Sequence, residues 1–299
     1  MNLRQAIAAS AAQLAADGHL KATASRDAEF LLLHTLGMSR ATLLAYPERE
    51  LTADQQMAYE GNVARRLTHE PIQYITGQQE FYGLTMKVTP AVLIPRPETE
   101  LLVEAVLGLL HADAPLRIVD IGTGSGAIAI ALAVHLPHAK ITALDVSTAA
   151  LAVAEDNARE HRVADRIRFL QSDLLSAVGA GVAVFDAIVS NPPYVAEADR
   201  NTLHPEVRDY EPASALFAGE SGLDIYRRLI PAALAALKPS GLLALEIGQG
   251  QEAAIGDLLE RWKNVSFLKD LQSIPRVGLA RRPAPSGTIR WNSSTMKGG

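Results

Sequence analysis

The chain contains no cysteine among its 299 residues. Disulfide bonds, thiolate nucleophiles and cysteine-ligated zinc are therefore excluded, and the composition agrees with a reducing compartment. The chain also lacks any run of 18 or more apolar residues, which a membrane-spanning helix would need. Residues 1–6 lack the charged start and apolar middle of a signal peptide, so we expect a cytoplasmic protein.

An excess of positive charge is also missing, because 28 Lys and Arg face 33 Asp and Glu, for a formal net charge of -5. This balance argues against broad, phosphate-driven binding of nucleic acid, although it leaves room for a local basic patch. The eight histidines show no metal-ligand spacing, so we predict no metal site. With 48% hydrophobic residues, the chain has enough apolar material for one large domain and a smaller one.

The first part of the chain has a helical pattern. Leu3, Ile7 and Leu14 fall on one face of a helix. A second helix is expected to begin at Ser25 and to run to Gly37.

A capping box predicts the next helix. Thr52 and Gln55 have the required spacing, and the helix can continue until Pro71 forces a stop. We interpret Arg65 and Arg66 as solvated residues on this helix rather than as a binding patch.

The period then changes to that of strands. Residues 73–77 and 81–88 are predicted to form the two strands of a connecting hairpin. Pro97 suits the first position of a following helix. The apolar positions of that helix recur at Leu101, Ala105 and Leu109.

From Arg117 onward, apolar strand patterns alternate with helical ones, which implies parallel strands with helices on both faces. We place strands near 117–121, 140–144, 166–170, 184–190, 241–247, 265–270 and 277–282. The predicted fold class is α/β, with a seven-stranded doubly wound, Rossmann-like sheet. The predicted domains are a helical one at 1–72, a β-hairpin linker at 73–96, the α/β domain at 97–282 and a poorly ordered tail at 283–299.

A glycine-rich loop closes the first strand of the α/β domain. Gly122, Gly124 and Gly126, with Thr123 and Ser125 between them, lead into a helix whose N-terminus has free N–H groups. Such a loop could bind a dinucleotide pyrophosphate, but its glycines are spaced more closely than in the dinucleotide fingerprint.

Two acidic residues follow at the ends of the next two strands. Asp145 and Asp173 should lie beside the glycine loop, because parallel strands end at the same edge of the sheet. Asp145 can accept hydrogen bonds from two ribose hydroxyls, and Asp173 can orient an adenine amine. Capping of a helix by Asp145, or of a short turn by Asp173, is the alternative for each.

The fourth strand ends in Asn191-Pro192-Pro193-Tyr194. Prolines restrict the backbone and leave neighbouring carbonyls free, the Asn191 side chain adds an oxygen, and the Tyr194 ring offers a flat face. Together they could hold a planar amino group by its two hydrogens. Alone, the stretch could equally be a loop that ends a strand.

The order of these features resembles that of S-adenosylmethionine-dependent methyltransferases that modify planar nitrogens. Over residues 1–282 the chain resembles the HemK/PrmC family of protein-glutamine N5-methyltransferases. The segments that carry this resemblance are residues 76–83 (TGQQEFYG), 93–100 (LIPRPETE), 210–216 (YEPASAL) and 222–226 (GLDIY), besides Asn191 to Tyr194.

The resemblance implies a cytoplasmic enzyme that methylates the glutamine of the Gly-Gly-Gln motif in class I peptide chain release factors. It also implies that residues 1–72 bind this protein substrate, with no direct contact to nucleic acid or membrane. By position, Gly122 to Gly126 and Asp145 correspond to residues that bind S-adenosylmethionine, with Asp173, Leu174 and Asn191 beside them, and Asn191 to Tyr194 correspond to the catalytic clamp. Relatives often have an aromatic residue where this chain has Leu174, so apolar packing is expected there instead of stacking on adenine.

Two other functions stay open at this point. An adenine exocyclic-amine methyltransferase acting on DNA or RNA would use a similar clamp, but it needs phosphate contacts and extrusion of the base. A cofactor-binding module without catalysis would have no use for Asn191 to Tyr194.

Overall fold

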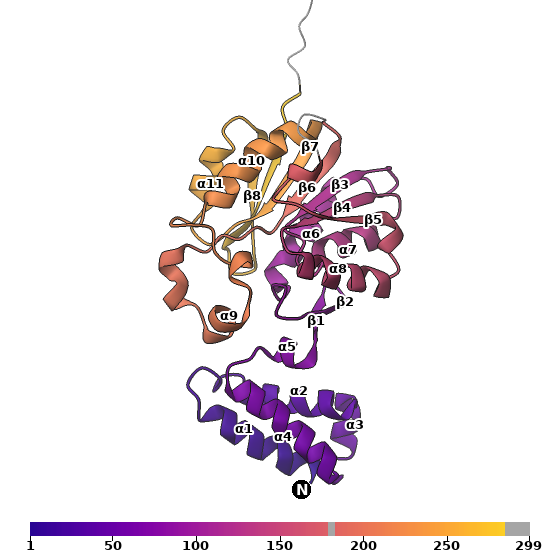
Figure 1. Cartoon of the computed structure of the whole chain (residues 1–299), viewed down its shortest axis with the longest axis vertical. Coiled ribbons are helices and arrows are strands. Elements are labelled where there is room, and N and C mark those ends of the chain that lie inside the picture. The colour runs from indigo at the N-terminus through magenta and orange to yellow at the C-terminus, as the bar shows by residue number, and fades with distance from the viewer. Residues whose placement is uncertain (179–182, 285–299) are drawn as a thin grey trace, which may run out of the picture.

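A seven-stranded sheet forms the centre of the computed structural model, which describes residues 1–178 and 183–284 (Figure 1). The strand order is β5-β4-β3-β6-β7-β9-β8, and only β9 runs antiparallel to its neighbours. The strands are β3 (Arg117–Ile121), β4 (Lys140–Asp145), β5 (Ile167–Gln171), β6 (Phe185–Ser190), β7 (Leu237–Glu246), β8 (Lys263–Lys269) and β9 (Pro275–Arg281). The predicted doubly wound α/β fold is therefore confirmed.

Helices cover both faces of this sheet. They are α6 (Pro97–Leu109), α7 (Ala127–His135), α8 (Thr148–Glu160), α10 (Asp224–Ala236) and α11 (Glu252–Leu258). Alternate residues of each central strand face opposite sides: Ile118 packs in the core beneath α6, α7 and α8, whereas Val119 packs in the core beneath α10 and α11. Burial of both faces explains why these strands are continuous apolar runs in the sequence.

Helix α6 begins at Pro97, as predicted. Leu102, Val103 and Val106 are fully buried, and Leu101 and Ala105 pack partly buried against the same core, whereas Leu109 is 43% exposed. Nearly every second position of this helix is apolar, so periodicity alone does not select the most buried side.

The N-terminal helices form a separate core, as the indigo ribbons of Figure 1 show. They are α1 (Leu3–Ala15), α2 (Ala24–Leu36), α3 (Arg40–Ala45) and α4 (Ala53–Leu67). The predicted capping box of Thr52 and Gln55 is present, and Gly37 ends α2 in the left-handed conformation. Two predicted boundaries were wrong: α2 begins before Ser25, and α4 ends well before Pro71.

The predicted first strand of the hairpin, residues 73–77, is also wrong. These residues lie in helix α5 (Ile72–Thr76), which starts directly after Pro71 and ends at Gly77 in the left-handed conformation. The local turn signals thus outweigh the strand propensity of Tyr, Ile and Thr. The hairpin itself consists of β1 (Gln78–Phe81) and β2 (Leu84–Lys87), joined at a two-residue turn whose residues both have positive φ.

The segment from Val195 to Phe217 connects the sheet with the N-terminal helices. It contains α9 (Pro205–Tyr210), and the Tyr210 hydroxyl donates to the backbone oxygen of Thr68 at 2.6 Å. Arg66 pairs with Asp27 of α2 and with Glu206 of α9, and it is only 3% exposed. The prediction that Arg66 is solvated was therefore wrong, since it forms a buried ionic link between the helices and this segment.

No helix in the described part of the chain is long and apolar enough to cross a membrane. The predicted tail, 283–299, lies almost entirely outside the described residues.

Candidate active site

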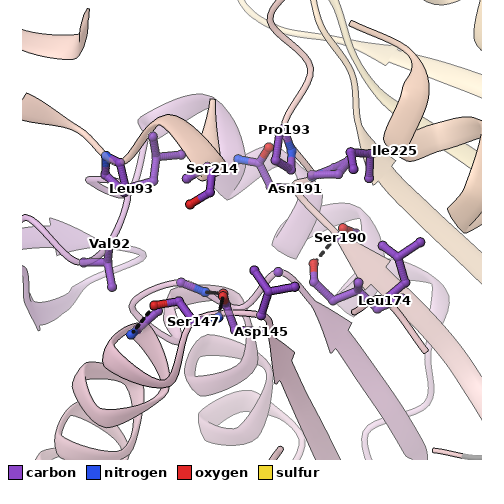
Figure 2. Close-up of a pocket in the computed structure, with 18 of the residues that line it drawn as sticks. Val92, Leu93, Asp145, Ser147, Leu174, Ser190, Asn191, Pro193, Ser214 and Ile225 are labelled. Atoms are coloured by element: carbon purple, nitrogen blue, oxygen red, sulfur yellow. Dashed lines mark hydrogen bonds between the residues drawn. The ribbon is translucent and has the colours of Figure 1, made fainter. Parts of the chain in front are cut away.

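A cleft opens at the carboxyl ends of β3, β4, β5 and β6. Figure 2 shows Asp145 and Ser147 on one side of it and Leu93, Asn191 and Pro193 on the opposite side. In the parallel sheet these strand ends come together, which is why residues far apart in the sequence share one cleft.

The glycine loop is held by backbone hydrogen bonds. The N–H groups of Gly122 and Thr123 both donate to the carbonyl of Leu144, at 2.8 and 2.9 Å. Gly122 and Gly124 line the cleft, and a Cβ built at Gly124 would meet nothing within 4 Å, so ligand atoms can approach its backbone.

The remaining loop residues have other roles. Thr123 and Ser125 are buried within the protein. Gly126 lies against α8, where a Cβ would come within 3.1 Å of the Ala154 Cβ. This glycine therefore allows two helices to pack closely, and the structure gives no contact between it and the cleft.

Asp120, just before the loop, is a residue that the sequence reasoning did not select. Its carboxylate accepts from the Thr123 hydroxyl at 2.7 Å. Burial raises the pKa of Asp120 to about 7, because desolvation outweighs this hydrogen bond. No feature of the sequence selects Asp120, because Val119 and Ile121 on either side of it are core residues and the pattern predicts only a buried strand.

Asp145 lies at the end of β4, against the glycine loop. One of its oxygens accepts from the Gly124 N–H and the other from the Ser147 N–H, both at 2.9 Å. Asp145 is not the cap of helix α8, because Ser147 occupies that position and accepts from the Ala150 N–H. Its carboxylate instead fixes the glycine loop and lines the cleft, and contact with a ligand stays a prediction. A carboxylate has about four acceptor positions, so two remain to receive hydroxyl groups of a ligand.

Asp173 and Leu174 lie at the next strand end and also line the cleft. The Asp173 carboxylate pairs with Arg228 of α10. Leu174 has a positive φ of 50° and packs against the core beneath α10, while Figure 2 shows it at the wall of the cleft. The local turn is made chiefly by Ser172, whose hydroxyl donates to the Leu174 carbonyl.

Asn191, Pro192 and Pro193 line the cleft, and Figure 2 shows Asn191 and Pro193 opposite Asp145. Tyr194 lines an adjoining pocket that also borders Asn191. The tyrosine is held by its backbone as well, because Gln251 donates to its carbonyl at 3.0 Å. Asn191 therefore stands between two cavities, one on the side of Asp145 and one on the side of Tyr194.

Two buried polar residues behind Asn191 were missed by the sequence reasoning. The Asn191 side chain donates to Thr99 of α6 at 3.1 Å, and Thr99 donates to Glu246 at the end of β7 at 2.6 Å. Burial raises the pKa of Glu246 to about 7, although hydrogen bonds from Thr99 and Tyr194 lower it. The only available signal in the sequence was an acid at the end of an apolar strand.

A second buried acid supports the wall of the adjoining pocket. Glu211 accepts from the Ile94 N–H at 3.2 Å and pairs with Arg96, which lines that pocket. Its contacts make Glu211 a structural residue. The described residues contain no group of three or more His, Cys, Asp or Glu side chains arranged to hold a metal ion.

Comparison with known proteins agrees with this geometry. The PrmC N-terminal domain model matches residues 5–77, and the methyltransferase small domain model matches residues 97–206. The release factor glutamine methyltransferase of Koribacter versatilis is 48% identical over 86% of this chain and 90% of its own length. That of Moorella thermoacetica is 45% identical over 94% of this chain and 99% of its own.

The chain belongs to the release factor glutamine methyltransferase family. The resemblance inferred from the sequence is thereby confirmed. Solved structures share the fold at lower identity. The hMettl16 catalytic domain in complex with an RNA hairpin has a TM-score of 0.53 and 17% identity, covering 77% of this chain and 82% of its own. A T. thermophilus 16S rRNA methyltransferase in complex with AdoMet and guanosine has a TM-score of 0.52 and 21% identity, covering 69% of this chain and 49% of its own.

The cleft fits the cofactor that a methyltransferase of this family uses, S-adenosylmethionine. Gly124 leaves open space beside its backbone, and Asp145 has acceptor positions for two ribose hydroxyls. Val146, Ala150 and Leu174 also line the cleft and give it apolar surface against which an adenine ring can lie.

Proposed function

We propose that this protein methylates the side-chain amide nitrogen of the glutamine in the Gly-Gly-Gln motif of class I peptide chain release factors. The observation that carries this proposal is the position of Asn191 between two cavities. One cavity offers S-adenosylmethionine the Asp145 carboxylate and the open backbone of Gly124, and the other extends from Asn191 to Val207 of α9. A cytoplasmic location, where release factors act, is part of the proposal.

Residues of the clamp make the substrate nitrogen reactive by orientation. An amide nitrogen is a poor nucleophile because its lone pair is delocalised into the carbonyl. The Asn191 side-chain oxygen and the Pro192 carbonyl are the acceptors for its two N–H groups, and the Tyr194 ring holds the amide plane. These hydrogen bonds strengthen as positive charge develops on the nitrogen.

S-adenosylmethionine supplies an activated methyl group on a sulfonium. No strong general base is required, because the methylated nitrogen becomes acidic and its proton can pass to solvent. Accordingly, the clamp contains no histidine or carboxylate, and Glu246 lies behind it, 2% exposed, without reaching the cleft.

The helices α1 to α4 and the segment from Val195 to Phe217 are the proposed binding surface for the release factor. Their link through Arg66, Glu206 and Tyr210 brings them together on the side of the adjoining pocket. A protein substrate needs such an extended surface, whereas a free amino acid would not.

Mass spectrometry of a release factor incubated with the protein and S-adenosylmethionine tests the proposal. The expected result is a gain of about 14 Da on the glutamine of Gly-Gly-Gln, since one methyl group replaces one hydrogen. A release factor with glutamic acid at that position is the matched control, because it has the same backbone but no amide nitrogen. Methylation of that control, or of adenine in DNA or RNA instead of the release factor, would overturn the proposal.

A further inference from the structure

A chain of buried hydrogen bonds runs from the clamp to the end of β7. Asn191 Nδ2 donates to Thr99 Oγ1 at 3.1 Å, and Thr99 Oγ1 donates to Glu246 Oε2 at 2.6 Å. The second carboxylate oxygen of Glu246 accepts from the Tyr194 hydroxyl at 3.4 Å. Two side chains of the clamp therefore meet at one acid from another strand.

Because this chain of bonds is buried, each group in it keeps a single role as donor or acceptor. Glu246 is 2% exposed and Thr99 is 4% exposed, so water does not offer them alternative partners. An ionised carboxylate only accepts hydrogen bonds, and a hydroxyl has a single proton to donate. Because the Thr99 hydroxyl donates its one hydrogen bond to Glu246, it can only accept a hydrogen bond from Asn191. The amide of Asn191 must then turn its NH2 toward Thr99.

We propose that Glu246, acting through Thr99, is a positioning residue that fixes which end of the Asn191 amide faces the substrate. The Asn191 oxygen is thereby directed to the substrate amide nitrogen, and it can accept a hydrogen bond from one of the N–H groups of that nitrogen. A flipped Asn191 would present its own NH2 and repel the substrate. This inference rests on the proposed function, because it concerns the same clamp.

The groups around Glu246 are consistent with an ionisable acid held by hydrogen bonds. Thr99 of α6 and Tyr194 of the clamp donate to it, and the nearby charges are those of Glu98, which raises its pKa, and Arg276, which lowers it. From α10, the Tyr226 hydroxyl donates to the Glu246 backbone carbonyl at 2.8 Å and fixes the strand end. None of the ion pairs among the described residues involves Glu246, so its carboxylate oxygens are left to Thr99 and Tyr194.

The first test removes the middle of the chain of bonds. Thr99→Val keeps the shape of the side chain but deletes its hydroxyl, so Asn191 is free to flip. We expect kcat to fall about 10- to 100-fold, with the Kd of S-adenosylmethionine changed less than about threefold. Thr99→Ser should restore kcat to within a few-fold. Thr76→Val is the matched control, since this buried threonine of α5 contacts only backbone oxygens at 3.4 and 3.5 Å and should leave kcat unchanged.

The second test reverses the direction of the bonds. In Asn191→Asp, the Thr99 hydroxyl cannot donate a hydrogen bond to the introduced carboxylate, because it already donates its one hydrogen bond to Glu246. Adding Glu246→Gln supplies an NH2 that can donate to Thr99, and the Thr99 hydroxyl is then free to donate to the introduced carboxylate. The introduced amide can meet Thr99 with its oxygen or with its NH2, so it no longer fixes one direction. We therefore expect Glu246→Gln to lower kcat when Asn191 is present but to raise it about tenfold or more in the Asn191→Asp background. The kinetics are measured at about pH 8.5, above the raised pKa of Glu246 of about 7, so that Glu246 is ionised in the Asn191→Asp variant.

The outcomes separate this inference from the proposed function. If the unaltered protein methylates the release factor but Glu246→Gln lowers kcat in both backgrounds, Glu246 is only structural and the inference fails. An unchanged kcat in Thr99→Val has the same meaning. If the unaltered protein does not methylate the release factor at all, the proposed function itself fails. Thermal unfolding and titration with S-adenosylmethionine, applied to every variant, confirm that each one is folded.

Discussion

The two sides of the cleft are held in place by different kinds of groups. On the side of Asp145, backbone N–H groups of the glycine loop and of Ser147 make the bonds. On the side of Asn191, side chains of Thr99 and Glu246 make them. Backbone bonds depend on the local fold, whereas a chain of side chains depends on the identity of each member. We therefore expect the first side to control cofactor affinity and the second to control turnover.

Asn191→Ala should give the largest separation between the two sides. It removes the acceptor for the substrate N–H and leaves the glycine loop intact, so kcat should fall about 10²- to 10³-fold. The Kd of S-adenosylmethionine, measured by calorimetry, should change only a few-fold. Equal loss of both would show that the two sides are not independent and would reject the clamp assignment.

Gly222→Ala should disturb the clamp through its backbone. A Cβ at this position would lie 2.3 Å from the Tyr194 carbonyl oxygen, so Tyr194 must move. We expect kcat to fall about 10- to 100-fold and the free energy of unfolding to fall by about 1–3 kcal/mol. Gly250→Ala is a matched control, because Gly250 also has a positive φ but its Cβ would meet nothing within 4 Å. Steady-state kinetics and denaturant unfolding of both variants check this; equal kcat values would contradict it.

Asp145→Ala should act in the opposite direction from Asn191→Ala. Loss of the carboxylate removes the proposed ribose acceptor and the partners of the Gly124 and Ser147 N–H groups. The Kd of S-adenosylmethionine should rise about 10-fold or more, while kcat at saturating cofactor falls less. An unchanged Kd in calorimetry would reject the ribose role.

The pH dependence of turnover should give the smallest effect. Because the pKa of Glu246 is raised to about 7, only about half of the molecules carry it as an ionised carboxylate at neutral pH, and nearly all of them do at higher pH. The kcat should therefore rise about twofold from pH 7 to pH 8.5 and decline as the pH falls below 7. In Glu246→Gln this step should be absent, even though Asp120, whose pKa is also about 7, remains. A step that persists in that variant would assign it to another group.

Much of the sheet could be predicted from the sequence, because its buried strands are short apolar runs separated by clear helix signals. The strand ends then placed the glycine loop, Asp145 and Asn191 at one edge without further information. Local signals failed where they conflicted: residues 73–77 have strand propensity, but Pro71 and Gly77 favour a helical turn.

Long-range pairing explains the other misses. Arg66 has the pattern of a surface helix residue, and only its buried partner Asp27, which is 1% exposed, reveals its role. Thr99 and Glu246 are separated by 147 residues, so no local pattern joins them to each other or to Asn191. A side chain whose function depends on a distant partner cannot be recognised from its own neighbourhood.

The buried Arg66 has a consequence for how the molecule can be divided. Its guanidinium pairs with Asp27, inside the N-terminal helices, and with Glu206 of α9, which lies 140 residues further along the chain. Moving α9 away from the N-terminal helices would take Glu206 from the guanidinium, while Asp27, which belongs to the same helices as Arg66, would stay paired with it. A chain shortened by residues 1–70 would therefore lose Arg66 and Thr68 together, and α9 would lose both of these contacts with the N-terminal helices.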